Sequence, residues 1–300
     1  MSRIRYDRLP TERADPGTGR LDRLSAVGIA RLMNRADRRA VRAVGRAAPA
    51  IGRAVDLIVR ALSRKGRLIF VGAGTSGRLG VLEAAECPPT FDTPPALVQA
   101  VIAGGRRTVF RSAEGAEDDG FDGARQIRRR VRRGDVVVGI AASGVTPFVR
   151  GALGEARRRG AATALVTCNP AVPASAARVV IALAVGPEVL TGSTRLKAGT
   201  ATKLALNTLT TASFARLGKV YGNRMVDLRP RSAKLRARAL RLVRELGGVS
   251  PREAEGLLRA ARGSAKLAIA MARLGVDARE ARRRLRAAAG SLRHALGVRS

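Results

Sequence analysis

The sequence has little of several residue types on which common functions depend. It contains one histidine, His294, no tryptophan, and only 3% aromatic residues. Its two cysteines, Cys87 and Cys168, stand far apart, in neither a C-x-x-C pattern nor a metal-site spacing with histidine. Metal sites and disulfide frameworks need such spacings, so we expect no metal, no other cofactor and no disulfide. With so few aromatic side chains to stack on bases, we do not expect a single-strand nucleic-acid surface either.

A long apolar run is also missing. No segment approaches the roughly 20 consecutive apolar residues that a membrane-spanning helix needs. The N-terminal stretch MSRIRYDRLPTERADP is not followed by the apolar segment of a secretion signal. The sequence therefore predicts a cytoplasmic protein that has no membrane partner.

Acidic residues are scarce, with 23 Asp and Glu against 57 Lys and Arg and a formal net charge of +34. Clustered basic residues would indicate nucleic-acid binding. Here they are spread over every predicted helix, and only six of them are lysine. Such a uniform distribution favours solubility and the attraction of a small anion, so we expect no nucleic-acid partner.

Short apolar runs alternate with helical patterns through the middle of the chain. Two amphipathic helices precede the first run, and a long helix, Lys197 to Leu217, follows the last. Such runs are typical of strands buried on both faces of a parallel sheet. We predict an α/β fold, a parallel sheet sandwiched by helices. The predicted strands are 68–71, 97–102, 135–141, 162–167 and 179–184, and the helices between them are 79–85, 108–113, 121–131 and 146–159.

Strand patterns cease near residue 230. Residues 231–300 predict a small C-terminal all-helical module of four helices, one of them opened by a capping box at 250–253. We therefore predict two domains: residues 1–230, an extended N-terminal arm, two lead-in helices and the α/β domain, and residues 231–300, the helical module. For the basic module a structural or dimer-supporting role is favoured over the docking of a nucleic acid or another protein, because charged helix faces are ordinarily solvated.

The stretch GAGTSG at residues 72–77 fits G-x-G-x-x-G, a pattern that opens many dinucleotide-binding sites. Such a site also needs an acidic residue at the end of the second strand, and here that strand ends AVIAGG. The turn instead offers Thr75 and Ser76 beside backbone N–H groups at Gly74 and the start of a helix. That combination suits a terminal phosphate.

The third strand ends in a similar turn, with Ser143, Gly144 and Thr146 in front of a helix. Because the carboxyl ends of parallel strands meet at one edge of the sheet, the two turns can converge on one phosphate. Either turn alone is weak support, since Ser and Thr cap helices generally. Together they favour a phosphosugar over a dinucleotide.

Two groups of carboxylates stand out against the basic background. Glu86 lies in AAECPPTF, where the Pro-Pro pair predicts the end of a helix, and Glu114 and Glu117 lie in AEGAEDD. Asp118 and Asp119 suit the capping of the helix that follows. Glu86 and Glu117 are the candidates for acid–base work, because two carboxylates in different surroundings can have separated pKa values. On the residues alone, capping and catalysis are equally supported.

A series of ordered blocks along nearly the whole chain resembles the N-acetylmuramic acid 6-phosphate etherases. The blocks are IFVGAGTSGRLGVLEAAECPPTF, AEGAEDD, DVVVGIAASGVTP, TCNP, GPEVLTGSTRLKAGTATKLALN and GKVYGNRMVDL. The resemblance implies the sugar isomerase (SIS) fold, a ubiquitin-associated-like helical tail, and a cytoplasmic lyase that needs no metal. Its substrate would be N-acetylmuramic acid 6-phosphate, and its products N-acetylglucosamine 6-phosphate and D-lactate.

The same resemblance implies roles for single residues. Glu86 would be the proton donor, Glu117 the second acid–base residue, and Glu114 a contact to a sugar hydroxyl. The family's site forms in a homodimer, so a homodimer with the site at the subunit interface is expected. The substrate phosphate would be bound by the two turns, at Gly74, Thr75, Ser76, Ser143, Gly144 and Thr146.

The chain departs from the family's pattern at a few positions. Val145 stands where the family has arginine, and Ala14 and Asp15 stand where it has Arg and Asn. Loss of the arginine predicts weaker substrate binding or altered recognition of the substrate carboxylate, unless Arg195 or Lys197 compensates.

Two other functions are compatible with the phosphate turns. An SIS phosphosugar isomerase would share them but would move a proton between adjacent carbons, and the blocks around Glu86 and Glu117 speak against it. A non-catalytic sugar-phosphate sensor, as in the related glucokinase regulatory proteins, would be much longer and contain two such domains. SIS transcription regulators carry an N-terminal helix-turn-helix, of which this sequence shows no sign.

Overall fold

A computed structural model describes residues 9–228, 230 and 232–298. The first eight residues of the predicted arm and the last two of the predicted module lie outside this range. Contacts divide the chain into two compact units, which are treated separately below. The first contains residues 1–85 and 96–210, and the second contains residues 86–95 and 211–300, within which the predicted module 231–300 falls.

The first unit is built on a five-stranded parallel sheet with the strand order β2-β1-β3-β4-β5. Every residue of β1 and β3 is buried, as the apolar runs predict. The five predicted strands are confirmed, with small differences at their ends. The strands are β1 (Leu68–Gly72), β2 (Val98–Ile102), β3 (Val136–Ile140), β4 (Ala162–Thr167) and β5 (Val179–Ala182).

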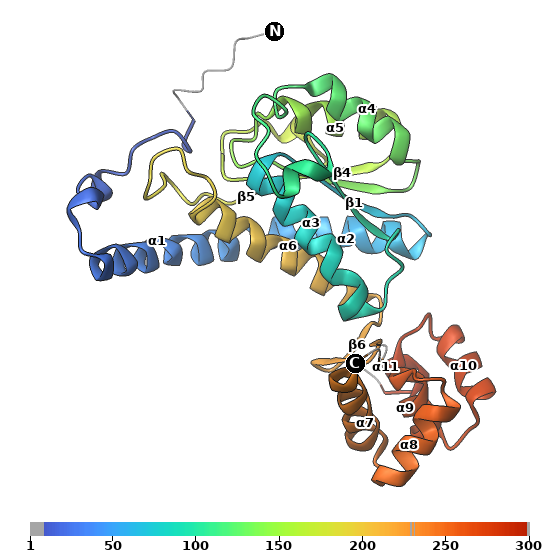
Figure 1. Cartoon of the computed structure of the whole chain (residues 1–300). Helices are drawn as coiled ribbons and strands as arrows, with labels where there is room; N and C mark the ends of the chain where they lie inside the picture. Colours follow the sequence, from blue (N-terminus) through green and yellow to red (C-terminus); the bar gives the residue numbers. More distant parts are fainter. Residues whose placement is uncertain (1–8, 229, 231, 299–300) are drawn as a thin grey trace. The chain divides into compact units, whose positions relative to one another are not determined.

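Helices cover both faces of the sheet, which confirms the predicted sandwich (Figure 1). One face packs against α4 (Gly120–Arg130) and α5 (Pro147–Arg158) in a core that includes Ile69, Val137 and Phe148. The other face packs against α2 (Ala48–Ser63) and α3 (Gly74–Phe91), with Gly80 of α3 placed against Phe70. The remaining long helices are α1 (Ala26–Arg46), which precedes α2, and α6 (Lys197–Arg216). Two short 3-10 turns, Pro16–Thr18 and Leu21–Arg23, lie in the arm.

A buried carboxylate ties the start of β1 to the start of β3. Asp135 is only 1% exposed and accepts hydrogen bonds from the backbone N–H groups of Arg67 and Arg132, both at 2.9 Å. The guanidinium of Arg67 adds an ion pair at 2.6 Å. A buried charge is costly unless it is paired and hydrogen-bonded, and here both conditions are met. The two strands are thereby held side by side at their amino ends.

Two sequence expectations about helices are wrong. Of residues 108–113, only 108 and 109 belong to a helical element, the 3-10 turn Arg106–Val109. The Thr108 hydroxyl donates to the carbonyls of Ala103 and Gly105, which favours this turn over an α-helix. The Pro-Pro pair does not end α3, which continues through Pro88 and Pro89 to Phe91. Proline inside a helix is ordinarily destabilising, but Phe91 is buried and stacks on Phe214 with ring centroids 4.6 Å apart.

The second unit contains the four predicted helices and two elements that the sequence analysis missed, a hairpin and the short last helix. A two-stranded hairpin, β6 (Val220–Tyr221) and β7 (Arg224–Met225), turns at Gly222 and Asn223. The predicted capping box is confirmed, since Ser250 and Glu253 bond each other's backbone N–H groups. The helices are α7 (Ala233–Gly247), α8 (Pro251–Ala260), α9 (Ala265–Leu274), α10 (Ala278–Ala287) and the short α11 (Leu292–Ala295).

Lys266 holds the segments of the second unit together from its centre. Its ammonium group donates to the carbonyls of Gly218 at 3.0 Å and Gly290 at 2.8 Å, and to the carboxylate of Asp227 at 2.7 Å. Burial lowers the pKa of this lysine, and the carboxylate of Asp227 opposes that shift. All three donors are used, so the ammonium joins the hairpin region to the last helices.

Both cysteines are buried, and among the described residues neither is in a disulfide. Cys168 follows β4 and is 2% exposed. Burial, with a further contribution from the carboxylate of Glu188, raises the pKa of the Cys168 thiol to about 12. In the described part of the chain, no helix is both long enough and apolar enough to cross a membrane.

We expect Gly151→Ala to destabilise the first unit by about 1–3 kcal/mol through overpacking. A methyl group at Gly151 of α5 would lie 2.0 Å from the carbonyl oxygen of Gly120, so α4 and α5 would have to move apart. The matched control is Gly154→Ala on the same helix, where a methyl group meets nothing within 4 Å. Urea unfolding should show the control unchanged or stabilised by about 0.5–1 kcal/mol. Equal stability of the two variants would contradict the close helix crossing.

The raised pKa of Cys168 predicts an inert thiol, because the thiolate is the reactive form. In a Cys87→Ala variant, which retains Cys168 alone, iodoacetamide should leave the folded protein unmodified at pH 8 to 9. The same variant in urea should react at the rate of an ordinary thiol. Rapid modification of the folded variant would show that this region opens readily.

Candidate active site

The candidate site lies where the strand order reverses. The chain passes from β1 outward to β2 and then returns to β3 on the other side of β1. In open parallel sheets, ligands bind at such a switch point, outside the carboxyl ends of the strands. Here α3 begins at Gly74 after β1 and α5 begins at Pro147 after β3, so two helix N-termini meet at this edge.

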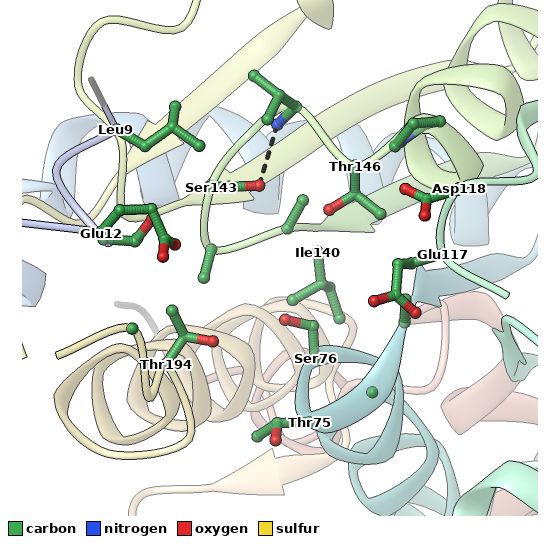
Figure 2. Close-up of a pocket in the computed structure, with 18 residues that line it drawn as sticks. Leu9, Glu12, Thr75, Ser76, Glu117, Asp118, Ile140, Ser143, Thr146 and Thr194 are labelled. Atoms are coloured by element: carbon green, nitrogen blue, oxygen red, sulfur yellow. Dashed lines mark hydrogen bonds between the residues drawn. The ribbon is translucent and has the colours of Figure 1, made fainter. Parts of the chain in front are cut away.

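A cavity of about 510 Å³ opens at this point (Figure 2). It is formed by the arm, both predicted turns, the acidic segment after β2, and the loop before α6. The lining residues are Leu9, Thr11, Glu12, Ala73, Gly74, Thr75, Ser76, Glu117, Asp118, Ile140, Ala141, Ala142, Ser143, Val145, Thr146, Pro147, Gly192 and Thr194.

The first turn has the geometry that a bound anion needs. Gly74 has a φ of +51°, a conformation that favours glycine, and it begins α3. A side chain at Gly77 would lie 2.5 Å from Ile102, so the helix packs directly against β2. Gly74, Thr75 and Ser76 therefore line the cavity from the first turn of α3, where backbone N–H groups have no partner within the helix.

The second turn presents two more hydroxyl groups. The Ser143 hydroxyl accepts a bond from the Val145 N–H at 3.3 Å, and the Ser143 carbonyl accepts from the Asn169 side chain at 3.0 Å. Thr146 is the N-cap residue of α5, yet its side chain makes no capping bond. Its hydroxyl lines the cavity and is available to a ligand.

Gly144 shapes the second turn from outside the main cavity. Its φ is +74°, and a side chain there would lie 2.1 Å from Val172. It lines a second cavity of about 590 Å³ and is absent from the lining of the main one. The structure thus gives Gly144 a conformational part in the site, whereas a direct contact with the phosphate stays a prediction.

The acidic segment after β2 supplies carboxylates to the site. Glu117 and Asp118 line the main cavity, and the Glu117 carbonyl accepts from the N–H of Phe148 at 2.9 Å. Of the two predicted caps, only Asp119 caps α4, through a bond from the N–H of Asp122 at 2.8 Å. Glu114 lines a smaller adjoining cavity of about 230 Å³, which also includes Glu117.

Glu86, the other predicted catalytic residue, is placed differently. It lies on α3 ten residues after Ser76, is exposed, and belongs to the second unit. It is not among the residues that line the main cavity. The structure of one chain therefore brings Glu117 to the cavity that both turns line and leaves Glu86 exposed on its helix.

The arm contributes site residues that the sequence analysis did not select. Leu9 and Thr11 are buried, and the Glu12 side chain lies in the cavity opposite Glu117, as Figure 2 shows. Thr11 and Glu12 belong to the block TERADP, in which the sequence analysis considered only Ala14 and Asp15. Asp15 in the same block caps the turn Pro16–Thr18 and pairs with Arg39 at 3.0 Å.

The loop that carries Gly192 and Thr194 is anchored by two buried charged residues, Glu188 and Lys197. The carboxylate of Glu188 accepts from the N–H groups of Lys197 at 3.0 Å and Ala198 at 2.8 Å, at the start of α6. The Lys197 ammonium donates to the carbonyl of Pro187. Burial raises the pKa of Glu188 and lowers that of Lys197, and the opposite charge of each partner resists these shifts.

The charges that line the main cavity are all negative. Three carboxylates, Glu12, Glu117 and Asp118, belong to its lining, and among the described residues no lysine or arginine does. Within the same described ranges, no group of three or more histidine, cysteine or acidic side chains is placed to hold a metal ion. Hydroxyls and helix N-termini for an anion, beside carboxylates for proton transfer, can support acid–base chemistry on a phosphorylated polyol.

Comparison with known proteins agrees with this geometry. Residues 50–157 match the family model of the glucokinase regulatory protein N-terminal SIS domain, and residues 120–212 match that of the SIS domain. The predicted SIS fold is thereby confirmed. A solved phosphoheptose isomerase from Francisella tularensis is 14% identical with a TM-score of 0.44, covering 63% of this chain and 100% of its own.

Two relatives are named N-acetylmuramic acid 6-phosphate etherase. That of Trichormus variabilis is 51% identical over 266 residues, which cover 88% of this chain and 86% of the relative. That of Trichodesmium erythraeum is 49% identical over 265 residues, covering 88% and 86%. With about half of its residues identical over most of its length, the chain belongs to the N-acetylmuramic acid 6-phosphate etherase family.

Proposed function

We propose that this protein cleaves the lactyl ether of N-acetylmuramic acid 6-phosphate, in the catabolism of amino sugars from the cell wall. It is a carbon–oxygen lyase, and its products are N-acetylglucosamine 6-phosphate and D-lactate. The observation that carries the proposal is the identity of about half of the sequence to relatives of this name. The cavity supports it, because phosphate-binding turns and a carboxylate, Glu117, face one space.

The reaction proceeds by elimination and then addition of water. In the ring-opened sugar, a carboxylate removes the proton from C2, which is acidic because the carbon lies beside the aldehyde. The C3–O bond breaks, and the ether oxygen leaves on lactate with a proton from a carboxylic acid. Water then adds to C3 of the unsaturated aldehyde while C2 regains a proton. One water is consumed, and no electrons are transferred to or from the substrate.

Two carboxyl groups are needed, and we assign them to Glu117 and Glu86. Glu117 lies in the cavity of its own chain. Glu86, the proton donor, is exposed on its own chain, and we infer that it acts in the site of a partner subunit within a homodimer. Glu114, in the adjoining cavity, is positioned for a sugar hydroxyl. The cytoplasm is the proposed location.

The substrate phosphate is assigned to the two turns. Thr75, Ser76, Ser143 and Thr146 offer hydroxyl groups, and both α3 and α5 direct the positive ends of their dipoles toward the cavity. Val145 in the second turn offers no charge, so the phosphate is held mainly by hydroxyl and backbone donors.

Release of D-lactate from N-acetylmuramic acid 6-phosphate tests the assignment of the two glutamates. We expect Glu86→Gln and Glu117→Gln each to lower kcat by at least about a hundredfold, because general acid–base catalysis contributes 10²–10⁴-fold. Glu255→Gln, which removes an exposed carboxylate on α8, is the control and should match the parent.

Mixing the two inactive variants tests the shared site. A randomly assembled heterodimer has one site with both glutamates and one with neither, so subunit exchange should restore about a quarter of the parent's activity. No recovery, with exchange verified by an affinity tag that only one of the two variants carries, would place both glutamates of a site in one chain. A parent protein that releases no lactate would refute the proposed activity itself.

The free hydroxyl of Thr146 makes a separate prediction. Because this group caps no backbone N–H, Thr146→Val should leave stability unchanged while KM for the sugar phosphate rises about tenfold, the value of one hydrogen bond to a charged group. Ser250→Ala is the converse control. It should cost about 1 kcal/mol of stability through a lost cap and leave KM unchanged. A Thr146→Val protein with an unaltered KM would remove this residue from the phosphate site.

A further inference from the structure

The proposed substrate is more negatively charged than the main cavity can accommodate by itself. It carries a phosphate at one end and the lactyl carboxylate at C3. The phosphate has two helix N-termini and their hydroxyl groups. The carboxylate would enter a space whose described lining contains three carboxylates and no cation. A carboxylate placed there without a positive partner would be repelled.

The second cavity has the opposite charge and adjoins the first. Its volume is about 590 Å³, and it shares Leu9 and Val145 with the main cavity. Two arginines, Arg150 and Arg157, line it, and among the described residues no carboxylate does. Because Val145 is short and apolar, the wall between the two spaces carries no charge of its own.

Arg150 is the arginine whose position follows from the phosphate site. It lies one turn along α5 from Thr146, and its backbone N–H donates to the Thr146 carbonyl at 3.0 Å. Within the described part of the chain its guanidinium forms no ion pair. Arg157, by contrast, already donates to the carbonyl of Ser175 at 2.9 Å. Val149 and Leu153 also line this cavity, and both are almost fully buried in the core beneath it.

The other nearby cations are less suitable. Arg78 lies in the small cavity with Glu114 and Glu117, which compensate its charge, and it donates to the Val109 carbonyl at 2.9 Å. Lys197 is fully buried, and its ammonium is bonded to Pro187. Arg195 is exposed and is not among the residues that line either large cavity.

We propose that the second cavity is the subsite for the lactyl group and that Arg150 binds its carboxylate, with Val149 and Leu153 beside the lactyl methyl group. Arg150 is thus a specificity-determining residue for the acid at C3. A guanidinium binds a carboxylate through two parallel N–H bonds, so it also orients the group that leaves. This inference rests on the proposed etherase activity and extends it to one side chain.

The test compares two substrates in the parent protein and in three variants. The first substrate is N-acetylmuramic acid 6-phosphate, and the second is its primary amide, in which the lactyl carboxylate is neutral. The parent should prefer the acid in kcat/KM, and Arg150→Met should lower that preference about tenfold, as expected for a charge-assisted hydrogen bond that is open to solvent. Arg150→Lys should restore part of the preference. Arg53→Met, which removes an exposed arginine from α2, is the control for net charge and should retain it.

Each outcome separates this proposal from the activity on which it rests. If the parent cleaves both substrates and Arg150→Met keeps the parent's preference for the acid, the carboxylate assignment is wrong and the etherase activity stands. If Arg150→Met lowers kcat/KM equally on the acid and the amide, Arg150 contacts the phosphate and not the lactyl carboxylate, and the proposal is overturned as well. If the parent cleaves neither substrate, both the activity and the subsite are refuted. Thermal unfolding of each variant shows whether a loss arises from misfolding.

Discussion

The pairing of β1 with β3 is the constraint on which the site depends. Their register is parallel over five residue pairs, and the buried carboxylate of Asp135 bonds to backbone groups before both strands. Once the two strands lie side by side, the helices that follow them must begin at the same edge of the sheet. Two helix N-termini and four hydroxyl groups then face one cavity. Close glycine contacts between α4 and α5 let the acidic segment before α4 reach the same place.

The distribution of charge in this protein is unusual for a site that binds an anionic sugar. The chain as a whole has a formal charge of +34, yet the described lining of the main cavity is acidic. No lysine or arginine among the described residues lines that cavity, although Arg78 lies with Glu117 in the smaller cavity beside it. The general positive field still attracts the substrate from solution.

Some elements were predictable because their signals are local. Buried strands such as 136–140 are short apolar runs made mostly of β-branched residues, and the capping box at Ser250 is contained in four residues. The wrong predictions concern segments whose conformation depends on residues outside the segment. The Pro-Pro pair predicts the end of a helix, but α3 continues through it to Phe91. Phe91 packs on Phe214, which is far away in the sequence, and this contact stabilises the end of α3. The segment 108–113 has a helical pattern, but the Thr108 hydroxyl donates to the carbonyls of Ala103 and Gly105, which precede the segment.

The sequence by itself determined the class of fold, the two turns at 72–77 and 143–146, the candidate carboxylates and the family, because each is visible in short patterns of adjacent residues. Only the tertiary structure decided which of these lie together. It brought Glu117 into the cavity, left Glu86 exposed, added Glu12 from the arm, and placed Gly144 and Arg150 on a neighbouring space. The physical reason is that strand order and helix crossing are set by packing over the whole unit. No local pattern of residues encodes which loops then share an edge of the sheet.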